Sequence, residues 1–299
     1  MPTGSFNVEE TGAVRLRSLL FVPGDSEKKL AKAVHIEADV LIVDLEDSVA
    51  PERRDTAREL TFQFLRTHNR SIWVRINPLE SEDANEDLES IMPALPAGIV
   101  LPKCGSGADV AELSMRMDPM ERRVGERTGR TKILPIATEL PEALFNLQSY
   151  IGCSSRLAGI TWGAEDLSAA IGASRTRYAD HAWTHPFQLA RSLSLMTAKA
   201  SGVLAIDTLY QDFRDMDGLR RCAVAARLDG FDGMLAIHPN QVPIINAAFT
   251  PTDKEIERAR RIVDAFEANG NTGVIAFEGR MLDAPHLKYA RRVLAFSHR

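Results

Sequence analysis

The amino-acid sequence predicts an α/β protein, a (β/α)8 TIM barrel with a C-terminal helical extension. Eight short apolar runs recur along the chain, and each is nearly continuous in apolar residues rather than alternating. This pattern is typical of strands that are buried on both faces of a parallel sheet. Segments of helical length separate the runs, and eight such alternations over about 230 residues match a barrel in size and in strand number.

In chain order, the strands are predicted at 17–22, 40–45, 72–77, 98–103, 133–139, 157–163, 203–207 and 233–238. Helices are predicted between them, for example at 26–38, with Ser26 as N-cap, and at 215–229. An open doubly wound sheet is the alternative, but such a sheet usually has a glycine-rich phosphate turn after its first strand. Here the first strand leads into Pro23-Gly24-Asp25 without a GxGxxG motif, which favours the barrel.

The same pattern divides the chain into three parts. We predict a flexible N-terminal tail at 1–14, a barrel domain that carries the site at 15–250, and a C-terminal helical extension at 251–299. The extension is predicted to begin with a helix near 252, to break at Asn269-Gly270-Asn271 and to continue as a helix at 284–296. It is longer than closure of a barrel requires.

Composition and charge exclude several classes of protein. The 299 residues include 36 Lys and Arg against 41 Asp and Glu, a formal charge of −5 that argues against nucleic-acid binding. No apolar run approaches the roughly 18 residues of a membrane span, and the N-terminus lacks the regions of a signal peptide. Cys104, Cys153 and Cys222 form no CxxC pair or zinc spacing, so we interpret them as reduced, buried thiols. We therefore expect a cytoplasmic protein without nucleic-acid or membrane partners.

Ionisable side chains lie at or near the carboxyl ends of seven predicted strands. In strand order they are Asp44, Glu46 and Asp47; Arg75; Lys103; Glu139; Glu165 and Asp166; Asp207; and His238. Active sites of barrel enzymes lie at this face. Unpaired charge near a core costs several kcal/mol, so stability alone does not explain this concentration of charge.

Glu139 and Asp166, at the ends of adjacent strands, are the best candidates for a metal site. A hard divalent cation offsets the repulsion among carboxylates on one rim, and an oxygen-only ligand set suits Mg²⁺. The His and Cys ligands that zinc prefers are absent at these two positions. In the structural alternative, each carboxylate forms a salt bridge or caps the following helix.

Arg75 ends a buried strand and therefore needs an anionic partner. Its planar guanidinium suits a substrate carboxylate or a developing oxyanion, and the alternative is a salt bridge to Glu46 or Asp47. In the functional interpretation, Glu46 and Asp47 lie behind the site and orient water and basic side chains.

Two further features have both a functional and a structural interpretation. Lys28, Lys29 and Lys32 form a basic helix face near the end of the first strand, which suits phosphate groups or is simply solvated. His238, on the last strand, is interpreted as a core histidine with satisfied hydrogen bonds.

Several of these motifs together resemble the β subunit of citrate lyase and its CoA-ester lyase relatives. The relatives include the malyl-CoA and citramalyl-CoA lyases of the HpcH/HpaI aldolase superfamily. The resemblance begins with RSLLFVPGDSEKKLAKA and EADVLIVDLEDSVAPERRDTAR and continues through WVRINP, IVLPKC, PIATE, GITWGAEDLSAAIG, AIDTLYQDF, AIHPNQV, FTPTDKEIERARRIVDAF and GRMLDAPHLKYARRVL. It covers 17–296, and the family's barrel with a C-terminal extension agrees with the strand count.

The resemblance implies roles for individual residues. Glu139 and Asp166 match the family's two Mg²⁺-binding carboxylates, with Glu139 close to the substrate, and Arg75 matches the arginine that contacts substrate oxygen. Asp283 resembles the aspartate that the extension delivers to a neighbouring subunit's active site, so a homotrimer or a hexamer is implied. The basic face of Lys28, Lys29 and Lys32 is the candidate for binding the CoA phosphates.

Three positions depart from the family pattern. Leu140 follows Glu139 where the family usually has a hydroxyl, and Met234 stands near the place of a lysine. Asp25-Ser26-Glu27 replaces a stretch that often carries an arginine for the CoA phosphates.

The activity implied by the resemblance is Mg²⁺-dependent carbon–carbon cleavage of a β-hydroxyacyl-CoA thioester, such as citramalyl-CoA or malyl-CoA. A retro-Claisen route gives acetyl-CoA or propionyl-CoA and a 2-oxo acid. One alternative is the citryl-acyl-carrier-protein lyase subunit of citrate lyase, which has an acyl carrier protein as partner. The other alternative is a catalytically quiet subunit that binds a CoA ester.

Overall fold

The computed structural model describes residues 16–179, 181–270 and 273–297. The predicted N-terminal tail, 1–14, lies outside these residues. The described chain falls into two compact units, divided between Asn246 and Ala247. Within the described ranges, the helices are too short or too polar to cross a membrane.

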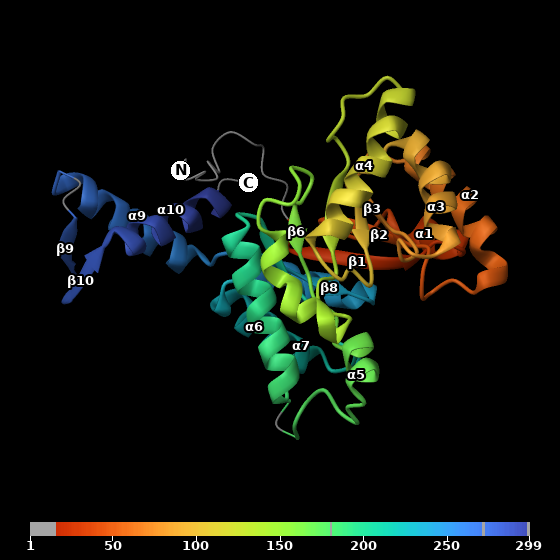
Figure 1. The fold of residues 1–299 in the computed structure, drawn as a ribbon. Helices are drawn as coiled ribbons and strands as arrows, with labels where there is room; N and C mark the ends of the chain where they lie inside the picture. Colours follow the sequence, from red (N-terminus) through yellow and green to blue (C-terminus); the bar gives the residue numbers. More distant parts are fainter. Residues whose placement is uncertain (1–15, 180, 271–272, 298–299) are drawn as a thin grey trace. The chain divides into compact units, whose positions relative to one another are not determined.

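Eight parallel strands build the larger unit, in the hydrogen-bonded order β5-β4-β3-β2-β1-β8-β7-β6 (Figure 1). They are β1 (Ser18–Pro23), β2 (Val40–Asp44), β3 (Ile72–Arg75), β4 (Gly98–Leu101), β5 (Lys132–Pro135), β6 (Gly159–Ile160), β7 (Leu204–Asp207) and β8 (Gly233–Ala236). Parallel bridges from Ile133 to Leu157 and from Ile136 to Thr161 join β5 to β6 and nearly close the barrel. The predicted fold class and all eight predicted strands are confirmed.

The inside of the barrel is a packed hydrophobic core. Side chains from alternate strand positions form one cluster, which includes Leu19, Val40, Ile42, Trp73, Val100, Leu134, Ile206 and Leu235. Because side chains alternate along a strand, the residues between them face the surrounding helices. Gly98 lies so close to Trp73 that a Cβ atom there would be 2.3 Å from a ring carbon, so the indole fills the space of a side chain.

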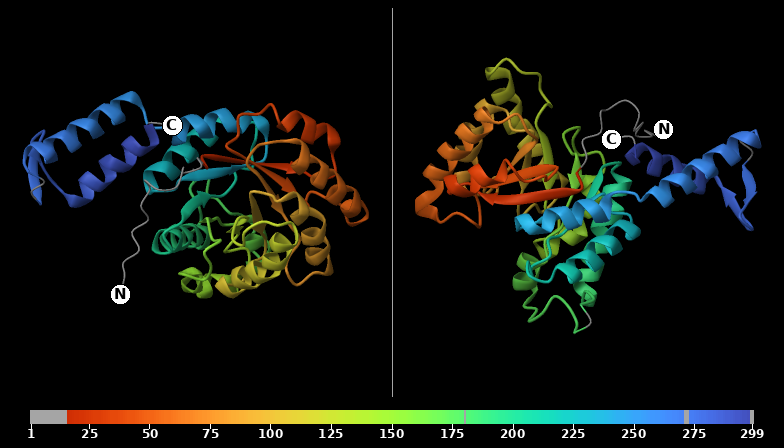
Figure 2. Two further views of the ribbon diagram at one scale, coloured as in Figure 1. Left: turned by 90° about the horizontal axis from the view of Figure 1, so that it is seen from above. Right: turned by 180° about the vertical axis from the view of Figure 1, so that it is seen from behind.

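Helices surround the strands of this unit (Figure 2). They are α1 (Glu27–Ala33), α2 (Arg54–Thr67), α3 (Glu82–Ile91), α4 (Gly107–Arg123), α5 (Glu165–Ile171), α6 (His185–Ala200) and α7 (Met216–Asp229). The next helix, α8 (Val242–Phe249), contains the boundary between the two units. Short 3₁₀ helices are η1 (Pro51–Arg53), η2 (Met92–Ala94) and η4 (Pro239–Gln241), and a longer one, η3 (Pro141–Tyr150), follows β5.

The predicted helix at 26–38 is too long, because α1 ends at Ala33. The guanidinium of Arg70 donates hydrogen bonds to the carbonyl oxygens of Ala33, Val34 and Ala38 at 3.3, 2.7 and 2.7 Å. These bonds satisfy carbonyl groups that a longer helix would have used internally. The predicted helix at 215–229 is confirmed as α7.

The smaller unit contains α9 (Asp253–Ala268), β9 (Val274–Phe277), β10 (Arg280–Asp283) and α10 (Ala284–Ser297). Ile262, Phe266, Leu282 and Val293 belong to its core. The two helices were predicted, but the hairpin of β9 and β10 was not. Its turn residues, Glu278 and Gly279, have φ of 48° and 76°, and a Glu-Gly pair is a much weaker hairpin signal than Asn-Gly.

Candidate active site

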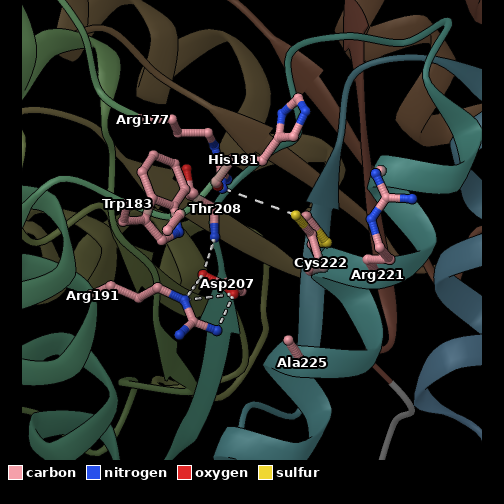
Figure 3. A pocket seen from close by; sticks show the side chains of 12 residues that line it. Arg177, His181, Trp183, Arg191, Asp207, Thr208, Arg221, Cys222 and Ala225 are labelled. Carbon is pink, nitrogen blue, oxygen red and sulfur yellow. Dashed lines mark hydrogen bonds and ion pairs between the residues drawn. The ribbon is translucent and has the colours of Figure 1, made fainter. Parts of the chain in front are cut away.

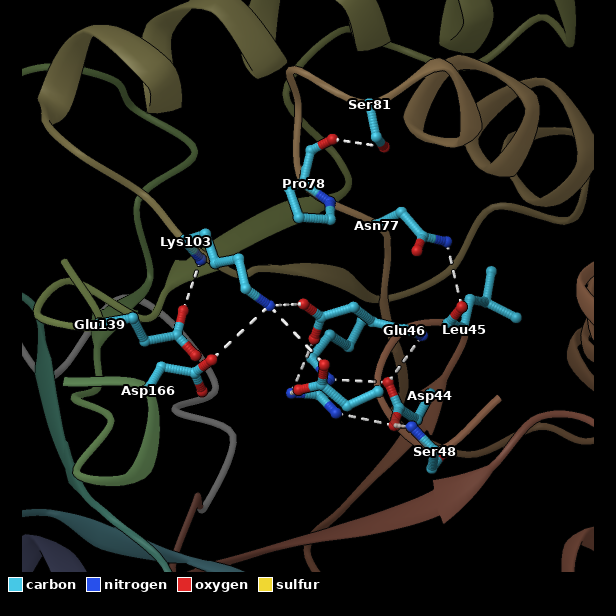
Figure 4. Close-up of polar contacts among 12 residues, drawn as sticks. Asp44, Leu45, Glu46, Ser48, Asn77, Pro78, Ser81, Lys103, Glu139 and Asp166 are labelled. Carbon is cyan, nitrogen blue, oxygen red and sulfur yellow. Dashed lines mark hydrogen bonds and ion pairs between the residues drawn. The ribbon is translucent and has the colours of Figure 1, made fainter. Parts of the chain in front are cut away.

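Seven ionisable side chains meet at the carboxyl end of the barrel strands, and Figure 4 shows this region. We call this group the mouth cluster, and it consists of Asp44, Glu46, Asp47, Arg75, Lys103, Glu139 and Asp166. Parallel strands bring these residues together because all their carboxyl ends lie at one face. Asp44 and Arg75 are the last residues of β2 and β3, whereas Asp166 lies in the first turn of α5.

Asp44 holds Arg75 in a fixed position. The Nε and Nη2 atoms of Arg75 each donate a hydrogen bond of 2.7 Å to the two carboxylate oxygens of Asp44. Nη1 of Arg75 lies 2.9 Å from Glu46 and 3.3 Å from Asp47, the two partners named in the structural alternative. Burial alone would raise the pKa of Asp44, but the bonds from Arg75 hold it below its usual value. The result is a rigid, permanently charged guanidinium at the mouth.

Lys103 lies next to four carboxylates of the mouth cluster. Its Nζ atom contacts Glu46 and lies 3.7 Å from Asp47 and 3.8 Å from Asp166. Its backbone N–H donates to Oε2 of Glu139. The backbone of Lys103 has a φ of 48°, a left-handed conformation that is uncommon for a residue with a side chain. One residue therefore supplies both an ammonium group and a backbone donor to the site.

Glu139 is the most deeply buried of the two candidate metal ligands. It is 2% exposed, whereas the side chain of Asp166 is 38% exposed. Burial raises the pKa of Glu139 to about 8; the hydrogen bond from the backbone N–H of Lys103 lowers it, and the neighbouring carboxylates of Asp166 and Glu46 raise it. Burial likewise raises the pKa of Glu46 to about 7. Figure 4 shows the carboxylates of Glu139 and Asp166 side by side, next to Lys103.

The charges of the mouth cluster suit a divalent cation. Five carboxylates face two cationic side chains, those of Arg75 and Lys103. Within the described ranges, no group of three or more His, Cys, Asp and Glu side chains could hold a metal ion. A cation at Glu139 and Asp166 would thus have two protein carboxylates, and Mg²⁺ usually takes one or two and keeps several waters. The two residues fit Mg²⁺ by ligand type and number.

Two residues of the mouth cluster, Asp44 and Lys103, were recognised in the sequence only as strand-end residues. No site role was predicted for either. The available signal was their position, since a lysine after β4 that faces predicted carboxylates needs to pair with some of them. Its specific contacts depend on a loop conformation that no sequence pattern indicates.

The other predicted site residues are not members of the mouth cluster. Lys28, Lys29 and Lys32 are exposed on α1, the helix that follows β1. Asp283 belongs to the smaller unit, where its Oδ1 lies 2.5 Å from Nδ1 of His286. Both side chains of that pair are about half exposed, 51% and 52%.

The three cysteines and His238 were predicted to be buried, and only Cys104 is buried. Cys104 is buried, and burial raises the pKa of its thiol to about 12. Cys153 and Cys222 are half-buried, so the expectation of three buried thiols is wrong for these two. His238 is also half-buried; it stacks on Phe213 at 5.1 Å, and its Nδ1 accepts a hydrogen bond from the backbone N–H of Asn240.

The barrel and its mouth cluster define a (β/α)8-barrel enzyme with its functional groups at the carboxyl ends of the strands. Residues 17–239 match the family model for HpcH/HpaI aldolase/citrate lyase. The chain belongs to the HpcH/HpaI aldolase/citrate lyase family and is a carbon–carbon lyase.

Three similar proteins cover nearly the whole chain. Citrate lyase subunit beta of Escherichia coli K12 is 33% identical over 284 residues, which is 93% of this chain and 92% of that protein. Mitochondrial citramalyl-CoA lyase of Rattus norvegicus is 31% identical over 94% of this chain and 86% of its own length. The crystal structure of CitE from Mycobacterium tuberculosis in complex with magnesium, acetoacetate and coenzyme A has a TM-score of 0.79 and 32% identity, covering 95% and 98% of the two chains.

Proposed function

We propose that this protein is a Mg²⁺-dependent lyase that cleaves a β-hydroxyacyl-CoA thioester, such as citramalyl-CoA or malyl-CoA. The products are acetyl-CoA or propionyl-CoA and a 2-oxo acid. The observation that carries this proposal is the paired carboxylates of Glu139 and Asp166 beside the fixed guanidinium of Arg75. The relative in rat named citramalyl-CoA lyase supports the substrate class.

Glu139 and Asp166 would hold the Mg²⁺ ion, as their ligand type and number suggest. When bound, Mg²⁺ supplies Lewis-acid polarisation of substrate oxygens and a template for their orientation. The complex of Mycobacterium tuberculosis CitE with magnesium, acetoacetate and coenzyme A supports Mg²⁺ as the ion.

Arg75 and Lys103 would bind and orient the anionic end of the substrate. Asp44 fixes the guanidinium of Arg75 through two hydrogen bonds, so its charge does not need to be reoriented as charge develops on substrate oxygen. Glu46 and Asp47 contact the same guanidinium and the ammonium of Lys103 and keep both groups in place.

The reaction requires two proton transfers by general acid–base groups. The substrate hydroxyl loses its proton, the carbon–carbon bond breaks, and its electron pair passes to the carbon next to the thioester carbonyl. That carbon then takes up a proton. We assign the second transfer to Asp283, acting from a neighbouring copy of the chain in a homotrimer or a hexamer. Lys28, Lys29 and Lys32 are assigned to the CoA phosphates.

The β subunit of citrate lyase is the second candidate function. The 33% identity to the Escherichia coli subunit over 93% of this chain favours it. In this alternative the thioester is carried by an acyl carrier protein, and the chain acts only on citryl groups attached to that partner.

A substrate panel tests the proposal. Purified protein with Mg²⁺ is given malyl-CoA, β-methylmalyl-CoA, citramalyl-CoA and citryl thioesters of CoA and of acyl carrier protein, and release of the 2-oxo acid is measured. We expect turnover of at least one CoA ester by the protein alone. Turnover of only the carrier-bound citryl thioester would establish the second candidate, and turnover of none would overturn both.

A further inference from the structure

A second cavity lies outside the barrel mouth, in the layer between the strands and the helices (Figure 3). Its volume is about 310 Å³, and residues of β7, β8, α6 and α7 line it. Ile206 and Leu235 belong to the core inside the barrel, so the adjacent Asp207 and Met234 face outward into this cavity. None of its lining residues belongs to the mouth cluster. The cavity is therefore a separate site.

One of the three arginines that line the cavity is already neutralised. Nη2 of Arg191 lies 2.8 Å from Asp207, and its Nη1 lies 2.7 Å from Asp229. Asp207 also accepts a hydrogen bond of 2.7 Å from the indole N–H of Trp162. The acceptor capacity of Asp207 is thus used by Arg191 and Trp162 and leaves little for another cation.

The other two arginines, Arg177 and Arg221, have no ion pair with any described residue. The guanidinium of Arg177 lies 3.4 Å from the ring centroid of Trp183 and donates to the carbonyl oxygen of His181 at 2.7 Å. Burial lowers the pKa of Arg177, and the nearby Cys222, Tyr210 and Asp207 offset this only in part. The carboxylate of Asp215 attracts Arg221 without forming a salt bridge with it, and it accepts hydrogen bonds from the Tyr210 hydroxyl and the Gly218 N–H, at 2.6 and 2.8 Å.

The size and walls of the cavity indicate an organic ligand. A volume of 310 Å³ is at the lower limit of about 300 Å³ for small-molecule pockets, and it corresponds to roughly ten waters. Trp183, Ala225 and Met234 provide apolar wall, and Cys222 presents a thiol between the arginines. Figure 3 shows Cys222 between Arg177 and Arg221, and Nη1 of Arg177 lies 4.0 Å from the thiol sulfur of Cys222. A short carbon body with anionic groups at the arginines matches these walls.

We propose that this cavity binds a small organic dianion, a short dicarboxylate or a phosphomonoester, between Arg177 and Arg221. Two guanidinium groups that form no salt bridge with a described residue match the two negative charges of such a ligand. The inference does not depend on the reaction proposed for the barrel mouth, because the two sites share no residue.

Protection of Cys222 from alkylation tests the proposal at the site itself. The full-length protein is treated with iodoacetamide, and modification of each cysteine is followed by peptide mass spectrometry. Succinate and glycerol 3-phosphate are the probes, and succinamide is the neutral control. We expect succinate or glycerol 3-phosphate to slow modification of Cys222 in a saturable way. Cys153, which is half-buried and does not line the cavity, is the internal reference and should be unaffected.

Neighbouring arginines on α7 provide a matched pair of variants. Arg221→Met should raise the half-protecting probe concentration roughly tenfold, since a charge-assisted hydrogen bond is lost. Arg220→Met, at an exposed position outside the cavity lining, should leave it unchanged. Glu139→Gln, in the barrel mouth, should also leave it unchanged. The probe that protects at the lower concentration identifies the ligand class.

Titration calorimetry with the same probes gives an independent measurement. Binding by wild type and by Arg220→Met, with weaker binding by Arg221→Met, supports the site even where Cys222 reacts too slowly. The proposal is overturned if neither probe binds, if succinamide protects equally, or if Glu139→Gln removes the binding.

Discussion

Replacement of Arg156 by methionine is expected to destabilise the barrel by about 3–5 kcal/mol, because it leaves a buried carboxylate without its counter-ion. Arg156 is 1% exposed, and its Nη1 and Nη2 atoms donate to Glu121 at 2.8 and 2.6 Å. Glu121 itself is fully buried and also accepts from the backbone N–H groups of Gly129 and Thr131, each at 2.8 Å. The two N–H groups cannot replace a full positive charge.

The pKa of Glu121 gives a second estimate of how much stability the Arg156–Glu121 pair contributes. Burial alone would raise this pKa, but the bonds from Arg156, Thr131 and Gly129 lower it from 4.5 to about 2. Because the pKa of Glu121 is lower in the folded state than in the unfolded state, its carboxylate stabilises the fold. This contribution is fully present above pH 4.5 and is lost as the pH falls toward 2. The difference corresponds to about 3 kcal/mol, in agreement with the range for breaking a buried pair.

Urea unfolding at pH 7 and at steps down to pH 3 measures the loss of stability caused by Arg156→Met and its dependence on pH. At pH 7, the Arg156→Met variant should have a lower urea midpoint of unfolding than wild type. The difference between the two midpoints should become smaller as the pH falls. Arg123→Met is the control, because its ion pair with Glu89 is 63% and 53% exposed and should be worth less than about 1 kcal/mol. Equal effects of the two substitutions at pH 7 would refute the reasoning.

Three predictions concern the proposed lyase. Glu139→Ala combined with Asp166→Ala should abolish 2-oxo acid release without loss of folding by circular dichroism, and substantial activity of this double variant with EDTA present would contradict the metal assignment. Arg75→Lys should reduce the rate roughly 10²-fold or more, because an ammonium cannot keep both bonds to Asp44; wild-type kinetics would leave Arg75 with only a structural salt bridge. Asp283→Ala should be inactive alone, and mixing it with Glu139→Ala should restore activity if Asp283 acts in a neighbouring subunit; a mixture as inactive as its parts would contradict that assignment.

Most of the fold could be predicted from the sequence because strands buried on both faces leave a strong local signal. Residues 40–43 and 98–101 carry no polar side chain, and both segments lie in the barrel as predicted. Features set by contacts between distant residues could not be predicted in the same way. Arg70 ends α1 from 37 residues away in sequence, and the hairpin turn at Glu278 needs a conformation that glutamate does not favour.

The positions of the site residues could be predicted from the sequence, but their contacts with one another could not. Strand ends bring Glu139 and Arg75 to one face, so their neighbourhood follows from the barrel itself. The pairing of Arg75 with Asp44 and the contacts of Lys103 depend on side-chain packing and on a single left-handed residue. The second cavity was missed because it forms between two strands, two helices and the segment before α6, and no periodicity indicates how these elements pack.

The left-handed backbone of Lys103 separates two properties that usually change together at an enzyme site. Its N–H group positions Glu139 whatever side chain is present, whereas its ammonium sets the charge beside Asp166. Glycine adopts this φ without strain, so Lys103→Gly removes a positive charge and retains the amide donor. A single substitution at position 103 can therefore change the electrostatic potential of the barrel mouth while the hydrogen bond to Glu139 is kept.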